Sequence, residues 1–262
     1  VPGFLPDLPE IRKELAQYYS SCHRCDETVG AVLHALDESG MADDTLVIFM
    51  SDNGMAFPFA KANCYLNSTK TPFIAKWKGH IKEGSWNRED YIAGVDYTAT
   101  ILEALGLADE LSGDGRSYLP LLLGEKQEDR DMVFTQFNTT AMKGSYPMRC
   151  IQSQQYGYIF NAWSDGETFY KNESMSGLTY KAMKRAGEED EELAERVRFF
   201  NYRCNEEFYD FKTDPDALHN LIHDPDQQER IKIYKERLKN YMKESNDPVY
   251  PQFAEYLEKQ QS

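Results

Sequence analysis

The feature that most constrains the fold is a short apolar run that stops at a cluster of polar residues. Residues 45–50 are continuously apolar apart from the first, and Ser51, Asp52, Asn53 and Gly54 follow directly. An unbroken run of this length is typical of a strand buried on both faces. In open α/β sheets, ligands bind beyond the carboxyl ends of strands, so Asp52 lies where a ligand site is expected.

Two interpretations of these polar residues remain open on spacing alone. Asp-Asn-Gly is a good turn sequence, because its side chains bond to their own backbone and glycine tolerates unusual backbone angles. A carboxylate beside a carboxamide oxygen also offers two hard donors, which suit Ca²⁺ or Mg²⁺ better than a thiophilic metal. Gly54 would let the backbone turn away without a side chain that blocks the ion.

The flanking residues indicate an α/β layer. Apolar residues recur every three or four positions between residues 11 and 38, which predicts a helix that ends at Ser39-Gly40. A second strand is expected at 72–77, and another helix at 96–105. Helix, strand, loop and strand in this order favour a layer with a parallel sheet.

The sequence pattern changes near residue 125. Shorter segments typical of strands follow, and their close spacing favours a small antiparallel sheet. A helix over 226–244 is expected to pack on this sheet. We therefore expect two domains, 1–125 and 126–262. The acidic run at 187–200 predicts a solvated helix face, with a regulatory or calcium-binding role as the alternative. The expected strands are 132–137, 149–154, 156–161 and 207–211.

Composition excludes some classes of function. The 44 acidic and 29 basic side chains give a net charge of -15, which repels nucleic acid. No apolar run approaches the roughly 18 to 20 residues of a membrane span. Five cysteines form no evident disulfide framework. Cys22 and Cys25 lie within the first helical pattern, so buried helix positions are expected, with metal or redox chemistry as the alternative.

Several blocks, in this order, resemble the sulfatase family of the alkaline-phosphatase superfamily. They are "DETVGAVLHALDESGMADDTLVIFMSDNG", then Lys61, "NSTKTPFIAKWKG", "VDYTATILEALGL" and "GRSYLPLLLG". The later blocks "SYPMRCIQSQQYGYIFN", "EEFYDFKTDPDALHNLIHDPD" and "KESNDPVYPQF" resemble the C-terminal region of the N-sulfoglucosamine sulfohydrolase, or heparan N-sulfatase, branch. The fold implied is α/β: the C-terminal part of an alkaline-phosphatase-like sandwich, then a small α+β subdomain with an antiparallel sheet and a packing helix.

The resemblance also implies roles for individual residues. Asp52 and Asn53 match two ligands of a divalent metal, most often Ca²⁺, with Mg²⁺ as the alternative. Lys61 matches a cation that contacts the sulfate and the nucleophile. Arg149 and Asn138 fall where relatives approach the substrate, a sulfated carbohydrate. A strand-edge arginine and a loop asparagine are the alternative interpretations of these last two residues.

The nucleophile of the family is absent from the sequence. Sulfatases convert a cysteine or serine of a C/S-x-P/A-x-R motif to formylglycine, and no cysteine or serine here has that context. The first residues lack an initiating Met and the pattern of a signal peptide. We therefore expect a C-terminal portion, inactive alone, whose missing N-terminal half carries the formylglycine. Family analogy places such enzymes in the periplasm, outside the cell or in the lysosome.

The resemblance leaves two alternative functions. One is a nonenzymatic sulfatase-like shell or binding protein, which has kept the fold and lost the nucleophile. The other is a related phosphodiesterase or phosphonate hydrolase, which would use the divalent metal in the same way for phosphoryl transfer.

Overall fold

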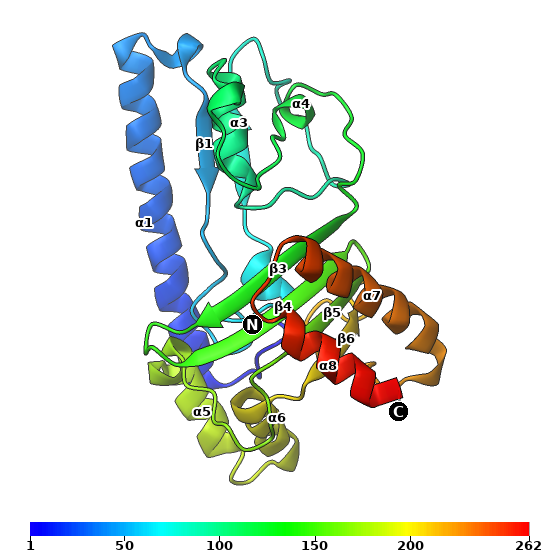
Figure 1. Cartoon of the computed structure of the whole chain (residues 1–262). Coiled ribbons are helices and arrows are strands. Elements are labelled where there is room, and N and C mark those ends of the chain that lie inside the picture. The colour runs from blue at the N-terminus through cyan, green and yellow to red at the C-terminus, as the bar shows by residue number, and fades with distance from the viewer. Residues whose placement is uncertain (262) are drawn as a thin grey trace. The chain divides into compact units, whose positions relative to one another are not determined.

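The computed structural model describes residues 1–261, which fold as two compact units built from discontinuous segments (Figure 1). Unit 1 comprises Val1–Gln17, Asn53–Lys70 and the residues from Phe134 onward, and unit 2 comprises Tyr18–Asp52 and Thr71–Val133. These units are not the two domains expected from the sequence, because unit 1 also takes segments from the first 70 residues. The division near residue 125 stays a prediction.

Unit 1 is built on a four-stranded sheet with the order β3-β4-β5-β6. The pairings of β4 with β5 and of β5 with β6 are antiparallel, and Met148 lies opposite Asn161. This confirms the small antiparallel sheet that the close spacing of the strands predicts. Its strands are β3 (Met132–Thr139), β4 (Ser145–Ser153), β5 (Tyr156–Asn161) and β6 (Glu206–Asp210).

Two helices, α7 (Gln228–Glu244) and α8 (Tyr250–Gln261), pack against this sheet (Figure 1). The buried face of α7 includes Tyr234, whose hydroxyl lies 2.6 Å from Ser153 Oγ. The expected packing helix is confirmed, whereas the sequence patterns gave no indication of α8. Unit 1 also contains α2 (Leu66–Thr69), α5 (Leu178–Ala186), α6 (Glu191–Tyr202) and the 3₁₀ turns Glu173–Ser176 and Pro225–Gln227.

The acidic run expected to form a solvated helix face does begin a helix. Asp190 caps α6, because its side chain accepts a hydrogen bond from the backbone N–H of Leu193 at 3.1 Å. Glu191 and Glu192 follow in the first turn and are exposed to solvent. Carboxylates at this position also interact favourably with the helix dipole.

Unit 2 contains a sheet of two strands, β1 (Val47–Met50) and β2 (Phe73–Lys76), which pair antiparallel. The expected parallel arrangement is therefore wrong, because an apolar run indicates burial but carries no information on strand direction. The expected burial of β1 on both faces is also wrong, since none of its residues is buried and Met50 is 43% exposed. The remaining elements are α1 (Pro9–Ser39), which begins in unit 1, α3 (Asp96–Ala104), α4 (Leu119–Leu122) and the 3₁₀ turns Ala42–Asp44 and Ala108–Glu110.

Few apolar side chains are buried in unit 2. Among its described residues, only Ala99, Tyr118 and Leu119 are buried apolar residues. The helix α1 has the expected periodicity, but none of its residues beyond Leu15 is buried. Cys22 and Cys25 are accordingly exposed, and their expected buried positions are wrong. Exposed large apolar side chains of this unit are Tyr19, Val32, Met41, Met50, Ile74, Trp86, Val95, Ile101, Leu105, Leu107 and Leu123.

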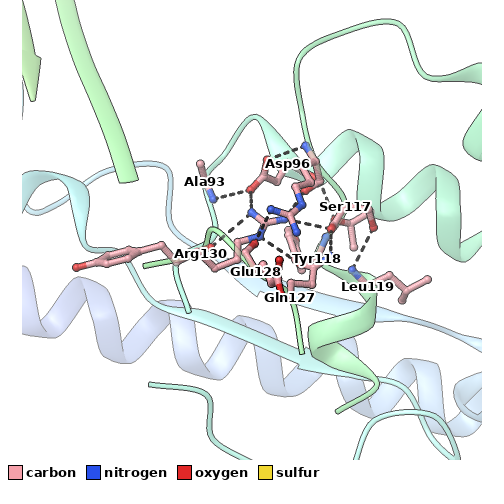
Figure 2. Close-up of polar contacts among 11 residues, drawn as sticks. Ala93, Asp96, Ser117, Tyr118, Leu119, Gln127, Glu128 and Arg130 are labelled. Atoms are coloured by element: carbon pink, nitrogen blue, oxygen red, sulfur yellow. Dashed lines mark hydrogen bonds and ion pairs between the residues drawn. The ribbon is translucent and has the colours of Figure 1, made fainter. Parts of the chain in front are cut away.

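A buried ion pair organises the loops of unit 2 (Figure 2). The Asp96 carboxylate, at the start of α3, accepts hydrogen bonds from the backbone N–H groups of Ala93 and Arg116. Arg130 Nη1 donates to the same carboxylate at 2.6 Å, and Arg130 Nη2 donates to the carbonyls of Arg116 and Ser117. Three segments that are separate in the sequence are thereby joined by polar contacts.

No helix within residues 1–261 combines the length and the apolar character that crossing a bilayer requires.

Candidate functional site

The chain bends at Asp52 and Asn53, shortly after β1 ends at Met50. Asp52 is exposed, and the N–H of Gly54 donates to Ser68 O at 2.8 Å. A Cβ atom on residue 54 would lie 1.9 Å from Asn67 O, so only glycine allows this close approach of two backbone segments. The turn interpretation is thus supported by the structure, and it does not exclude a ligand at the Asp52 and Asn53 oxygens.

The segment after this turn is a compact loop that carries Lys61. Backbone hydrogen bonds close it, since the N–H of Lys61 donates to Met55 O at 3.0 Å and Asn63 Nδ2 donates to Lys61 O at 3.2 Å. Phe59 and Ala62 adopt left-handed backbone angles, with φ of 63° and 67°. Such angles are costly for residues with a side chain and persist only where the surroundings enforce them.

Lys61 is half-buried, and its ammonium makes no hydrogen bond or ion pair with any described residue. The backbone on either side of it is buried: Ala60 is fully enclosed, and Ala62 is 7% exposed. A cation whose backbone is fixed and whose head group is unpaired is suited to bind an anion that arrives from outside the chain.

Arg149 and Asn138, the two expected substrate contacts, lie together in unit 1. Arg149 Nη1 donates to Asn138 Oδ1 at 2.9 Å, while Nε and Nη2 donate to the Asp247 carboxylate at 2.5 and 2.9 Å. Arg149 is buried in β4, an inner strand, and Asn138 is exposed. The guanidinium is therefore engaged within the chain, and a substrate contact by either residue stays a prediction.

The thiols in unit 1 are poor nucleophiles. Burial raises the pKa of Cys64 to about 12 and raises the pKa of Cys150 well above its ordinary value. Burial also raises the pKa of Cys204 to about 12. Because the thiolate is the reactive form of cysteine, these three residues are chemically silent near neutral pH.

The oxygen donors of Asp52 and Asn53 are of the type that a hard divalent cation binds, but two donors are too few to complete its coordination shell. Within the described part of the chain, no group of three or more His, Cys, Asp or Glu side chains is arranged to hold a metal ion. Ca²⁺ takes about six to eight oxygen ligands and Mg²⁺ about six. Two adjacent oxygen donors can form part of such a shell, and the remaining ligands must come from elsewhere.

Several residues that support this region were not expected from the sequence. The fully buried Glu207 accepts hydrogen bonds from the Tyr65 and Tyr209 hydroxyls, each at 2.5 Å, and from Asn161 at 2.7 Å. Arg203 donates to the Tyr65 hydroxyl. The sequence "FFNYRCNEEFYDF" places charged residues among aromatic ones, and this pattern could have predicted a buried ion network. Buried charges are rare unless they are paired.

Comparisons with known proteins show which proteins this chain resembles. Residues 3–107 match the family model described as Sulfatase. The human N-sulphoglucosamine sulphohydrolase is 30% identical over 262 residues, which cover 95% of this chain and 51% of that protein. The chain therefore spans about half the length of this curated relative.

Solved structures show the same fold. A putative sulfatase from Bacteroides fragilis superimposes with a TM-score of 0.70 at 20% identity, over 96% of this chain and 48% of that one. The protein BT4656, solved in complex with its substrate D-glucosamine-2-N,6-O-disulfate, gives a TM-score of 0.62 at 22% identity, over 85% and 39%. The expected fold class, mixed α/β with an antiparallel sheet and packing helices, is confirmed. The chain thus matches the Sulfatase family model over residues 3–107 and resembles the human N-sulphoglucosamine sulphohydrolase over about half of that protein's length.

Proposed function

We propose that the protein containing this chain hydrolyses sulfate ester or sulfamate groups on a glycan such as N-sulfoglucosamine. The observation that carries the proposal is the unpaired ammonium of Lys61, held on a closed loop that follows the Asp52-Asn53-Gly54 turn. The family match and the similarity to the human N-sulphoglucosamine sulphohydrolase support the reaction class. The substrate named for BT4656, a glucosamine disulfate, supports a sulfated sugar.

Lys61 would act on the sulfuryl group that is transferred. Its ammonium would pair with sulfuryl oxygens and stabilise the negative charge that develops as the sulfur–oxygen or sulfur–nitrogen bond breaks. The chain carries a net charge of -15, so the overall field repels a sulfated substrate and local cations must capture it. A lysine without an internal partner can provide that capture.

Asp52 and Asn53 would supply two oxygen ligands to a divalent metal, Ca²⁺ in the first instance and Mg²⁺ as the alternative. When bound, such an ion polarises the sulfuryl oxygens, and a formylglycine would provide the nucleophile. The two side-chain oxygens belong to consecutive residues, Asp52 and Asn53. The required glycine at position 54 keeps the backbone beyond them folded back onto Asn67 and Ser68.

The remaining ligands and the nucleophile would lie in an N-terminal half of the same protein. Unit 2 supports this part of the proposal, because large apolar side chains such as Val32 and Ile74 are more than 60% exposed. Where such side chains adjoin one another, the face that they form is typical of one that another part of a protein covers. The chain alone would then be inactive, and the whole enzyme would work in the periplasm, outside the cell or in the lysosome.

Comparing the full-length protein with residues 1–262 in isolation tests the proposal. Release of inorganic sulfate from glucosamine N-sulfate and glucosamine 6-sulfate is measured beside release of nitrophenol from bis(4-nitrophenyl) phosphate, a phosphodiester. We expect turnover of a sulfated sugar by the full-length protein and none by the isolated chain. No turnover by the full-length protein would favour the nonenzymatic alternative. Faster cleavage of the phosphodiester would favour the phosphodiesterase alternative.

A further inference from the structure

The Lys61 loop, defined as residues 55–65, is fixed to the core of unit 1 at three points. The first is the Phe59 ring. The guanidinium carbon of Arg196, on α6, lies 3.6 Å from its centroid, and Phe200 meets its edge at a centroid distance of 5.1 Å. Phe59 is 2% exposed, and these contacts hold its left-handed backbone angle. Cation–π and edge-to-face contacts of this kind stabilise a buried ring in one orientation.

The second point is the carbonyl of Ala62, the residue directly after Lys61. The hydroxyl of Tyr170 donates a hydrogen bond to this carbonyl, although the two residues are 108 positions apart. Tyr170 is completely buried, and its ring packs against Trp163, Tyr146 and Phe200. The hydroxyl therefore has a fixed position from which it holds the backbone beside Lys61.

The third point is Tyr65, at the end of the loop. Its hydroxyl donates to Glu207 and accepts a hydrogen bond from Arg203. The Arg203 guanidinium also lies within 5.5 Å of the ring centroids of Phe59, Tyr65 and Tyr170. One buried cation thus contacts the aromatic ring at each of the three fixed points.

These three contacts hold the backbone around Lys61, whereas the Lys61 ammonium has no partner among the described residues. We propose that Tyr170 is a positioning residue for Lys61: its hydroxyl holds the Ala62 carbonyl so that the ammonium meets the sulfuryl group in one geometry. This proposal rests on the proposed function of Lys61. Without the hydroxyl, a buried carbonyl would lose its partner, and the loop would move to find another. Small displacements of a group that contacts the reacting centre reduce turnover strongly.

The test is Tyr170→Phe in the full-length protein, with Tyr158→Phe as the matched control. Tyr158 is equally buried, and its hydroxyl donates to Glu206 at 2.6 Å, away from the Lys61 loop. We expect Tyr170→Phe to reduce kcat/KM roughly tenfold and to accelerate amide hydrogen exchange at residues 61–63. Tyr158→Phe should change neither quantity, although both variants lower the melting temperature.

Lys61→Ala separates positioning from a general loss of structure. In that background, Tyr170→Phe should produce no further loss of kcat/KM, because the group that Tyr170 positions is gone. An equal loss in both backgrounds would overturn the proposal, as would unchanged exchange at residues 61–63. Unchanged turnover in Lys61→Ala itself would refute the proposed function, and the positioning role would fall with it. A large effect of Lys61→Ala beside no effect of Tyr170→Phe would overturn the positioning role alone.

Discussion

Replacing Arg130 by methionine removes the cation from the buried ion pair of unit 2. Arg130 Nη1 lies 2.6 Å from Asp96 Oδ2, and both side chains are only 7% exposed. The second terminal nitrogen, Nη2, donates to Arg116 O at 2.8 Å and to Ser117 O at 3.1 Å. Methionine keeps much of the stem volume and deletes all of these contacts (Figure 2).

The expected loss follows from what the substitution leaves behind. The Asp96 carboxylate keeps the N–H groups of Ala93 and Arg116, at 3.1 and 2.9 Å, but it has no counter-charge. Removing one partner of a buried ion pair costs about 3–5 kcal/mol, because the other charge stays buried. Unit 2 has little apolar core to offset such a loss, so Arg130→Met should unfold it well before unit 1.

The assay is urea unfolding of the full-length protein, followed by hydrogen exchange of peptides from residues 91–130. Lys78→Met is the matched control in the same unit. Lys78 also pairs with a carboxylate at 2.6 Å, that of Asp43, but both side chains are more than 60% exposed. Exposed pairs contribute little to stability. A destabilisation by Arg130→Met no larger than that by Lys78→Met would refute the reasoning.

Two further predictions concern titratable groups. Cys22 and Cys25 are exposed, whereas burial raises the pKa of Cys64 to about 12, so iodoacetamide at neutral pH should modify the first two residues and spare Cys64 until the protein unfolds; equal labelling by mass spectrometry would contradict this. Burial acts to raise the pKa of Glu206, but hydrogen bonds from Lys235 and other donors outweigh it and place the pKa below its ordinary value. The resulting stabilisation is complete above the unfolded-state pKa of about 4.3 and disappears as the pH falls through the folded value. The stability difference between wild type and Glu206→Gln should therefore shrink on acidification, and a difference that grows would contradict the prediction.

Local structure could be predicted from the sequence where one segment determines it. The bounds expected for β5, 156–161, agree with the structure, because a run rich in aromatic residues follows the polar residues 153–155 and ends at Asn161. The direction of β2 could not be predicted, since it depends on which strand it pairs with. The exposure of α1 beyond Leu15 could not be predicted either, because periodicity defines an apolar face but does not show whether another segment covers that face.

The candidate site also combines features that a local segment reveals with contacts between distant segments, which it does not reveal. Asp52, Asn53 and Lys61 lie within ten residues of one another, so a single stretch of sequence carries the resemblance that predicts their roles. Arg149 is expected near the substrate because it falls where relatives approach the substrate. Its bidentate partner Asp247 is 98 residues away, and no local pattern reveals such a pairing. The same holds for Tyr170, which contacts the Lys61 loop from a distant segment.

The most direct test of the central claim is the turnover number for sulfate release from glucosamine N-sulfate by the full-length protein and its Lys61→Ala variant, at saturating Ca²⁺. Lys70→Ala, at an exposed lysine near the same loop, is the control. Loss of a group that stabilises transition-state charge typically lowers kcat about 10²- to 10³-fold, and we predict a loss of that order for Lys61→Ala and none for Lys70→Ala. A Lys61→Ala protein with wild-type turnover would contradict the account.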